Sequence, residues 1–218
     1  MRVPRISSFL FAALLALILT SSAFANSVTL TYEGHQGIVA QGGSPFIGYP
    51  YYFSINGSKT FTPLMCDSYD NNISLGETWQ AKVTPFLQGV GMFGSTASLD
   101  YKAAGLIFKS MLAGTLTTTQ AQWAVWGLFS TNAKNNPFFG TINGSSIDAT
   151  YLALAGTASS SSYSGLVLYT PIAGTQSAGG LPQEFIGYSA VPEPGTLLLF
   201  GTGLLGVAGA LRRKLTRT

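Results

Sequence analysis

Residues 51–65 read YYFSINGSKTFTPLM, with Asn56-Gly57 between two runs rich in aromatic and apolar side chains. Asn-Gly is a strong hairpin signal, because both residues readily take the positive φ angles of a tight turn between antiparallel strands. The stretch therefore predicts a β-hairpin whose strands occupy residues 51–55 and 59–65.

Further strand signals lie on both sides of this hairpin. Residues 28–32 alternate between apolar and polar side chains, and residues 78–84 form another candidate that Pro85 closes. Residues 166–169 and 184–188 have the composition of closing strands. Most of the chain between the two ends is thus predicted to be β-structure.

Between these strands, the apolar residues recur with the period of a helix. Residues 99–112 carry one apolar face, and a second stripe runs to about residue 130. Thr118 or Thr119 is expected to cap that second helix, and a third helix is predicted at residues 147–155.

The segment at residues 156–165 is rich in serine and is expected to be a flexible surface loop. Taken together, the pattern predicts an α+β fold that is mainly β. We expect one domain at residues 26–190, a β-sandwich or barrel-like structure with a helical insertion.

Charge is scarce, since only 9% of the 218 residues are charged while 46% are hydrophobic. The net charge of +3 comes from the two ends, because the body carries five lysines against seven acidic residues, a formal charge of −2. A basic surface that binds nucleic acid is therefore excluded.

The first 25 residues have the three parts of a secretory signal peptide. Arg2 and Arg5 supply the positive start, residues 6–19 are almost continuously apolar, and Ala23-Phe24-Ala25 is a small-x-small cleavage site. We expect signal peptidase to cut after Ala25; an uncleaved anchor is the alternative.

The last 28 residues, 191–218, also divide into three parts. Val191, Pro192, Glu193 and Pro194 are followed by an uncharged apolar run at residues 196–211. As a helix that run would reach about 25 Å, enough for a short span of the inner membrane. A basic stop follows, made of Arg212, Arg213, Lys214 and Arg217; by the positive-inside rule it holds the C-terminus in the cytoplasm.

This tail resembles the PEP-CTERM sorting signal of Gram-negative bacteria, in which a Pro-Glu-Pro motif, a membrane helix and an arginine-rich end follow in this order. The resemblance implies that exosortase, a membrane-embedded cysteine transpeptidase, cuts near Pro192–Pro194. It also implies a membrane-anchored precursor and then a cell-surface or extracellular protein, of the kind that accompanies exopolysaccharide and biofilm matrix. A permanent tail anchor is the alternative.

Residues for ordinary catalysis are sparse. The one histidine, His35, has no nucleophile motif near it, and one histidine with one cysteine is too few for a zinc site. Oxygen-bearing side chains cluster at residues 67–77, but their spacing differs from that of an EF-hand, so a polar turn is expected. We expect no metal, no cofactor and no enzymatic turnover.

Cys66 is the single cysteine of an exported chain and has no internal disulfide partner. With the helix segment Gln122-Trp123-Ala124-Val125-Trp126, it resembles the thioester domains of bacterial surface adhesins, which join a cysteine sulfur to a glutamine carbonyl. The resemblance implies a thioester between Cys66 and Gln122. The expected pocket residues are Ala124, Val125, Trp126 and Phe129.

Two features leave that resemblance open. Met65 stands where the family has an aromatic residue or leucine, and Gln120 lies as close to the apolar stripe as Gln122 does. A passive core thiol is the alternative for Cys66. We expect an adhesive protein of the surface or matrix that bonds to a surface nucleophile or to exopolysaccharide; the alternative is a non-covalent carbohydrate-binding module.

Overall fold

The computed structural model describes residues 27–40, 46–88, 90–178 and 180–189. The predicted signal peptide at residues 1–25 and the tail at residues 191–218, with its membrane helix at 196–211, lie outside this part. Within it, the helices are all too short or too polar to cross a bilayer.

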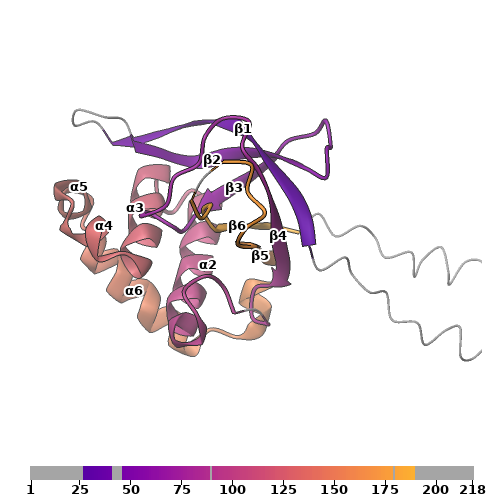
Figure 1. Cartoon of the computed structure of the whole chain (residues 1–218). Helices are drawn as coiled ribbons and strands as arrows, with labels where there is room; N and C mark the ends of the chain where they lie inside the picture. Colours follow the sequence, from indigo (N-terminus) through magenta and orange to yellow (C-terminus); the bar gives the residue numbers. More distant parts are fainter. Residues whose placement is uncertain (1–26, 41–45, 89, 179, 190–218) are drawn as a thin grey trace, which may run out of the picture.

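Six antiparallel strands close into a barrel in the order β1-β2-β3-β6-β5-β4 (Figure 1). Of the two expected architectures, a sandwich or a barrel, the chain adopts the barrel, and closure pairs each of these six strands on both sides. The strands are β1 (Ser27–Ala40), β2 (Phe46–Ile55), β3 (Thr62–Cys66), β4 (Thr78–Pro85), β5 (Leu166–Pro171) and β6 (Phe185–Tyr188).

The predicted hairpin joins β2 to β3. Asn56 and Gly57 have φ angles of 52° and 73°, and the Ser58 N–H donates to the Ile55 carbonyl at 3.0 Å, which closes the turn. Tyr51 lies opposite Leu64 in the ladder. The second strand begins at residue 62 rather than 59, so residues 59–61 of the expected strand remain outside the ladder.

The helices lie between β4 and β5 in the chain and together on one side of the barrel (Figure 1). They are η1 (Ser95–Ala97), α2 (Ser98–Leu112), α3 (Thr118–Phe129), α4 (Thr131–Asn135), α5 (Pro137–Thr141), α6 (Gly144–Thr157) and η2 (Ser160–Tyr163). The short helices α4 and α5 were not predicted.

Two local expectations about this helical insertion were wrong. Thr117, not Thr118 or Thr119, caps α3: its side chain accepts from the Gln120 N–H, and the Gln120 side chain accepts from the Thr117 N–H. The serine-rich segment is not only a loop, because it contains the end of α6 and η2. Tyr163 of η2 is buried and stacks on Phe86, which fixes this segment against the core.

Alternating residues of the strands supply two apolar cores. Leu64 and Cys66 belong to the cluster inside the barrel, whereas Met65 between them packs in the cluster shared with α2, α3 and α6. Helix α3 contributes to both clusters, with Trp123 and Trp126 in the first and three small residues (Ala121, Ala124 and Val125) in the second. Position 122 therefore lies where the helix meets the barrel.

Candidate functional site

Cys66 is the last residue of β3 and is completely buried as a free thiol. It lies opposite Phe185 of β6 in the ladder. The main chain of Ser68 turns back over the sulfur: its N–H donates to Sγ at 3.4 Å, and its carbonyl is 3.6 Å from Sγ. The thiol thus has a fixed direction at the end of the strand.

Gln122 is equally buried on α3 and makes two hydrogen bonds to the barrel. Its Nε2 donates to the carbonyl of Cys66 at 2.6 Å, and its Oε1 accepts from the Tyr49 N–H at 3.1 Å. The fold thus places the carboxamide of Gln122 directly on the residue that carries the thiol, across 56 positions of sequence. Gln120 is used differently, as the cap of α3.

The surroundings of Cys66 keep its sulfur protonated. Burial is the main reason that the pKa of the thiol is raised far above its usual value, and the nearby acidic residues Asp67 and Glu184 raise it further. The Trp126 indole N–H and the Ser68 N–H lower that pKa by smaller amounts. Any reaction at Sγ therefore needs a group that moves the proton.

The four expected pocket residues occupy different places. Ala124 and Val125 are fully buried against the helices, and Trp126 packs on Tyr69 with its ring centre 5.3 Å away. Phe129 stacks on Phe93 with ring centres 4.5 Å apart. Trp126 therefore shares the buried cluster of Cys66, while Phe129 packs against the other cluster.

Sequence reasoning missed a pair of buried carboxyls beside Cys66. Asp67 and Glu184 are both completely buried, although Asp67 was expected in a polar turn and Glu184 at a strand end. Glu184 directly precedes the apolar Phe185 and Ile186, and an acidic residue adjoining such a strand was the available signal. Their meeting depends on the pairing of β3 with β6, which no local pattern reveals.

The other acidic residues of the expected turn do not join them. Glu77 accepts the Ser74 N–H through Oε2 at 2.9 Å, and Asp70 accepts from Asn132 Nδ2 at 2.8 Å. Among the described residues, no group of three or more His, Cys, Asp or Glu side chains is placed to hold a metal. His35 is exposed and pairs with the Tyr32 hydroxyl through Nδ1 at 2.9 Å.

A cavity of about 240 Å³ adjoins the site and has Trp126 in its wall. Its lining is aromatic, aliphatic and amide, without a charged side chain: Tyr32, Phe46, Ile47, Tyr51, Tyr69, Asn72, Ile73, Trp126 and Gln183. Gln183 also connects it to the turn after β3, since its Nε2 donates to the Ser68 carbonyl at 3.3 Å. The cavity therefore lies next to the group that shields the sulfur.

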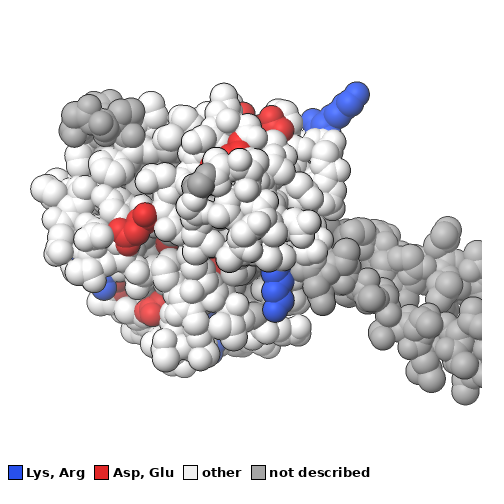
Figure 2. Space-filling model, in the orientation of Figure 1, with Lys and Arg blue, Asp and Glu red and all other residues white. Residues whose placement is uncertain are grey.

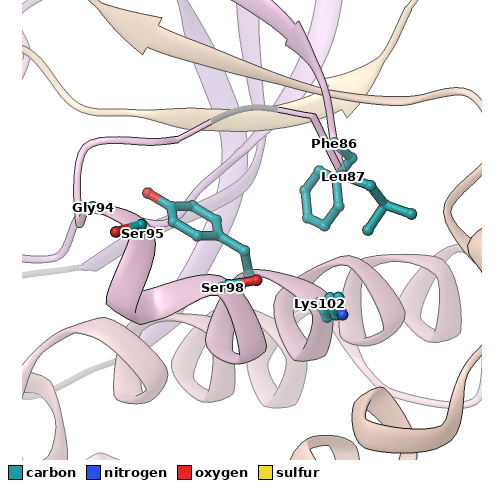
Figure 3. Close-up of a pocket in the computed structure, with 7 residues that line it drawn as sticks. Phe86, Leu87, Gly94, Ser95, Ser98 and Lys102 are labelled. Carbon is teal, nitrogen blue, oxygen red and sulfur yellow. The ribbon is translucent and has the colours of Figure 1, made fainter.

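A second cavity, of about 230 Å³, lies at the start of α2 (Figure 3). Phe86 and Leu87 stand on one side of it, and Ser95 and Ser98 on the other. Tyr101 in its wall donates its hydroxyl to Glu184, so this cavity borders the carboxyl pair from the helical side.

The surface matches the low charge of the chain. Charged side chains appear in Figure 2 as isolated spots on a largely uncharged face. A polyanion finds no extended basic surface on this face.

Comparison with known protein families gives one match. Residues 190–214 match the family model of the PEP-CTERM protein-sorting motif. The chain carries a PEP-CTERM sorting signal. No match was found among curated proteins or among solved structures.

The PEP-CTERM signal gives the chain a processing partner and a route. It marks a substrate of exosortase, so the protein is exported, and its precursor is anchored in the membrane before processing. This agrees with the expectation drawn from Pro192, Glu193 and Pro194 and from the basic stop. The matched residues lie outside the barrel domain, so the signal leaves the role of the domain itself open.

Proposed function

We propose that the barrel domain of this PEP-CTERM protein is an adhesive module of the cell surface or extracellular matrix, which bonds covalently through a thioester between Cys66 and Gln122. The observation that carries the proposal is the hydrogen bond of 2.6 Å from Gln122 Nε2 to the Cys66 carbonyl in a fully buried site. This hydrogen bond holds the carboxamide of Gln122 beside the one cysteine of the chain, as a reaction between the two residues requires.

The chemistry balances without a cofactor. Sγ of Cys66 attacks Cδ of Gln122, the C–N bond breaks, and the thiol proton leaves with the amide nitrogen as ammonia. The product is a thioester, which survives only where water is kept away. Complete burial of both residues, in a cluster that also contains Trp126, supports that requirement.

The bond is then available to a nucleophile on a partner. An amine or hydroxyl that enters the uncharged cavity beside Trp126 would take the Gln122 acyl group and return the thiol to Cys66. Each domain reacts once, so the protein is an adhesive and not a turnover enzyme. A partner in the exopolysaccharide or on a neighbouring surface fits export through the sorting signal.

The mass of the exported protein tests this proposal. Loss of ammonia lowers the intact mass by about 17 Da, and methylamine should add its own mass to that form. Cys66→Ala and Gln122→Ala should each abolish the deficit, while Gln120→Ala, the matched change on the same helix, should retain it. A full mass of the wild-type protein, with Cys66 open to alkylation once the protein is unfolded, would contradict the thioester.

A second candidate is non-covalent carbohydrate binding, and the same cavity favours it. Aromatic rings with amide side chains form a surface on which sugar rings stack and hydrogen-bond. If this function holds, retention on the exopolysaccharide purified from the producing culture is lost in Tyr69→Ala and kept in Cys66→Ala. Covalent retention, which requires Cys66, gives the opposite result for the cysteine variant.

A further inference from the structure

The carboxyl pair beside Cys66 is costly and has no charge partner. Asp67 and Glu184 are completely buried, and no lysine, arginine or histidine of the described residues forms an ion pair with either. A buried charge without a counter-ion is destabilising unless hydrogen bonds compensate for it, and such groups gather at functional sites. The pair lies directly next to the one thiol of the chain.

The hydrogen bonds show where the proton of the pair resides. Glu184 accepts from the Tyr101 hydroxyl at 2.5 Å, from the Met92 N–H at 2.9 Å and from the Thr170 hydroxyl, as expected of an ionised carboxylate. Asp67 accepts from the Ser68 hydroxyl through Oδ1 at 2.9 Å. Its Oδ2 meets no hydrogen-bond partner among the described residues, so the proton of the pair resides on Asp67.

The electrostatics agree with this arrangement. Burial raises the pKa of Asp67 well above its usual value, and the Glu184 charge raises it further. The titratable groups that face the pair are Tyr101 from α2 and Cys66 from β3. The raised pKa of Asp67 therefore agrees with the hydrogen bonds, which leave the proton of the pair on Asp67.

Ser68 connects the pair to the sulfur. Its hydroxyl donates to Asp67 and accepts from the Glu184 N–H at 2.9 Å, while its main chain contacts Sγ through both N–H and carbonyl. One residue thus bonds to the thiol on one side and to both acidic residues on the other. A change in the protonation of the pair therefore alters the hydrogen bonds of Ser68, the residue whose main chain contacts the sulfur.

We propose that Asp67 and Glu184 are positioning residues that hold and exchange one proton for the reaction between Cys66 and Gln122, acting through Ser68. This inference rests on the proposed thioester. As the S–C bond forms, the thiol proton passes to the carboxylate side of the pair. The proton held by Asp67 leaves with the amide nitrogen, so that ammonia departs and the pair ends with the proton count it began with. Opening by an amine runs the same exchange in reverse.

Closure of the ammonia-opened protein tests the exchange. Ammonia treatment of the exported wild-type protein restores Gln122, and after ammonia is removed the return of the mass deficit gives the closure rate. Because the chain has one cysteine, the S–H band in its Raman spectrum reports the same step independently. Asp67→Asn should close roughly 100-fold more slowly, the usual size of a lost acid–base contribution.

The pH profile distinguishes a proton-holding role from a structural one. Wild-type closure should slow as pH rises and Asp67 loses its proton, and Asp67→Asn should lose that dependence, while Asp67→Glu should recover part of it. The matched control is Asp148→Asn, which neutralises a buried carboxyl of α6 outside this network and should close at the wild-type rate.

Each outcome decides the matter. Closure of Asp67→Asn at the wild-type rate with the wild-type pH profile overturns the proton exchange and leaves the thioester standing. A wild-type protein that never shows the deficit overturns both. If Asp67→Asn does not fold, Tyr101→Phe replaces it. Loss of this donor leaves the negative charge of the pair with one hydrogen bond fewer, so Asp67 should keep its proton to higher pH and the profile should shift that way. An unshifted profile overturns the inference.

Discussion

Two of the buried carboxyls among the described residues, Glu184 and Asp148, have very different hydrogen-bond partners. Glu184 beside Cys66 has donors from a tyrosine, a threonine and a backbone N–H. Asp148 on α6 is almost as buried, yet neither of its oxygens meets a donor among the described residues. Glu184 therefore has hydrogen-bond donors that compensate for its burial, whereas Asp148 has none among the described residues. This difference indicates a functional role for Glu184 and none for Asp148.

Removal of the hydrogen-bonded carboxyl of Glu184 should have the largest effect on stability. Glu184→Ala leaves the Tyr101 hydroxyl, the Met92 N–H and the Thr170 hydroxyl without their acceptor in a closed core. We expect a loss of about 3–5 kcal/mol in the free energy of unfolding, measured by urea denaturation. Glu33→Ala, a change at an exposed carboxyl of β1, should stay within about 0.5 kcal/mol of the wild type; equal losses for the two would remove the distinction.

Removal of the Asp148 carboxyl, which has no hydrogen-bond donor among the described residues, should instead increase stability at high pH. Burial raises the pKa of Asp148 to about 7, with Lys134 lowering it and Asp100 raising it by smaller amounts. The folded state therefore favours the protonated form, and stability declines as pH rises from about 4 to about 7, by about 1.4 kcal/mol for each unit of pKa difference.

Asp148→Asn should abolish this decline, so the variant should be more stable than the wild type at pH 8. Thermal or urea unfolding at pH 5 and pH 8 measures both arms. A variant that is less stable than the wild type at pH 8 would show that the Asp148 carboxylate is stabilised by its surroundings. Asp148 and Glu184 would then no longer differ in this respect.

Two glutamines of α3 extend the comparison to neutral groups. Gln122→Ala leaves the Tyr49 N–H and the Cys66 carbonyl without their side-chain partner and should cost about 2 kcal/mol before any covalent bond is considered. Gln120→Ala removes half of the capping box and should cost about 1 kcal/mol. Chemical denaturation should show the larger loss of unfolding free energy for Gln122→Ala. A larger loss for Gln120→Ala would show that the cap of α3 contributes more to stability than the contact with the barrel.

Much of this fold could be predicted because its signals are local. Asn56-Gly57 forms its turn from two adjacent residues, and the stripe on α3 lies within one helix. Helices α4 and α5 were missed since each has only five residues, too few for a periodic pattern. The carboxyl pair was missed for another reason: Asp67 and Glu184 meet only when β3 pairs with β6, and nothing near either residue predicts that pairing.

The same division applies to the site. The resemblance of the motif around Gln122 predicted that this residue lies near Cys66, but the helical wheel did not distinguish Gln122 from Gln120. The hydrogen bond from Gln122 to the Cys66 carbonyl became visible only in the structure. The role of Ser68 was invisible in the sequence, because a serine after an aspartate is common on any turn. Its significance comes from the groups that it contacts in three dimensions.

The most direct test of the central claim is the intact mass of the exported protein before and after methylamine treatment. The thioester between Cys66 and Gln122 predicts a mass about 17 Da below that of the processed chain, and a methylamine adduct that restores the free thiol. A full mass, unchanged by methylamine and with Cys66 open to alkylation after unfolding, would contradict it and leave Cys66 as a core thiol.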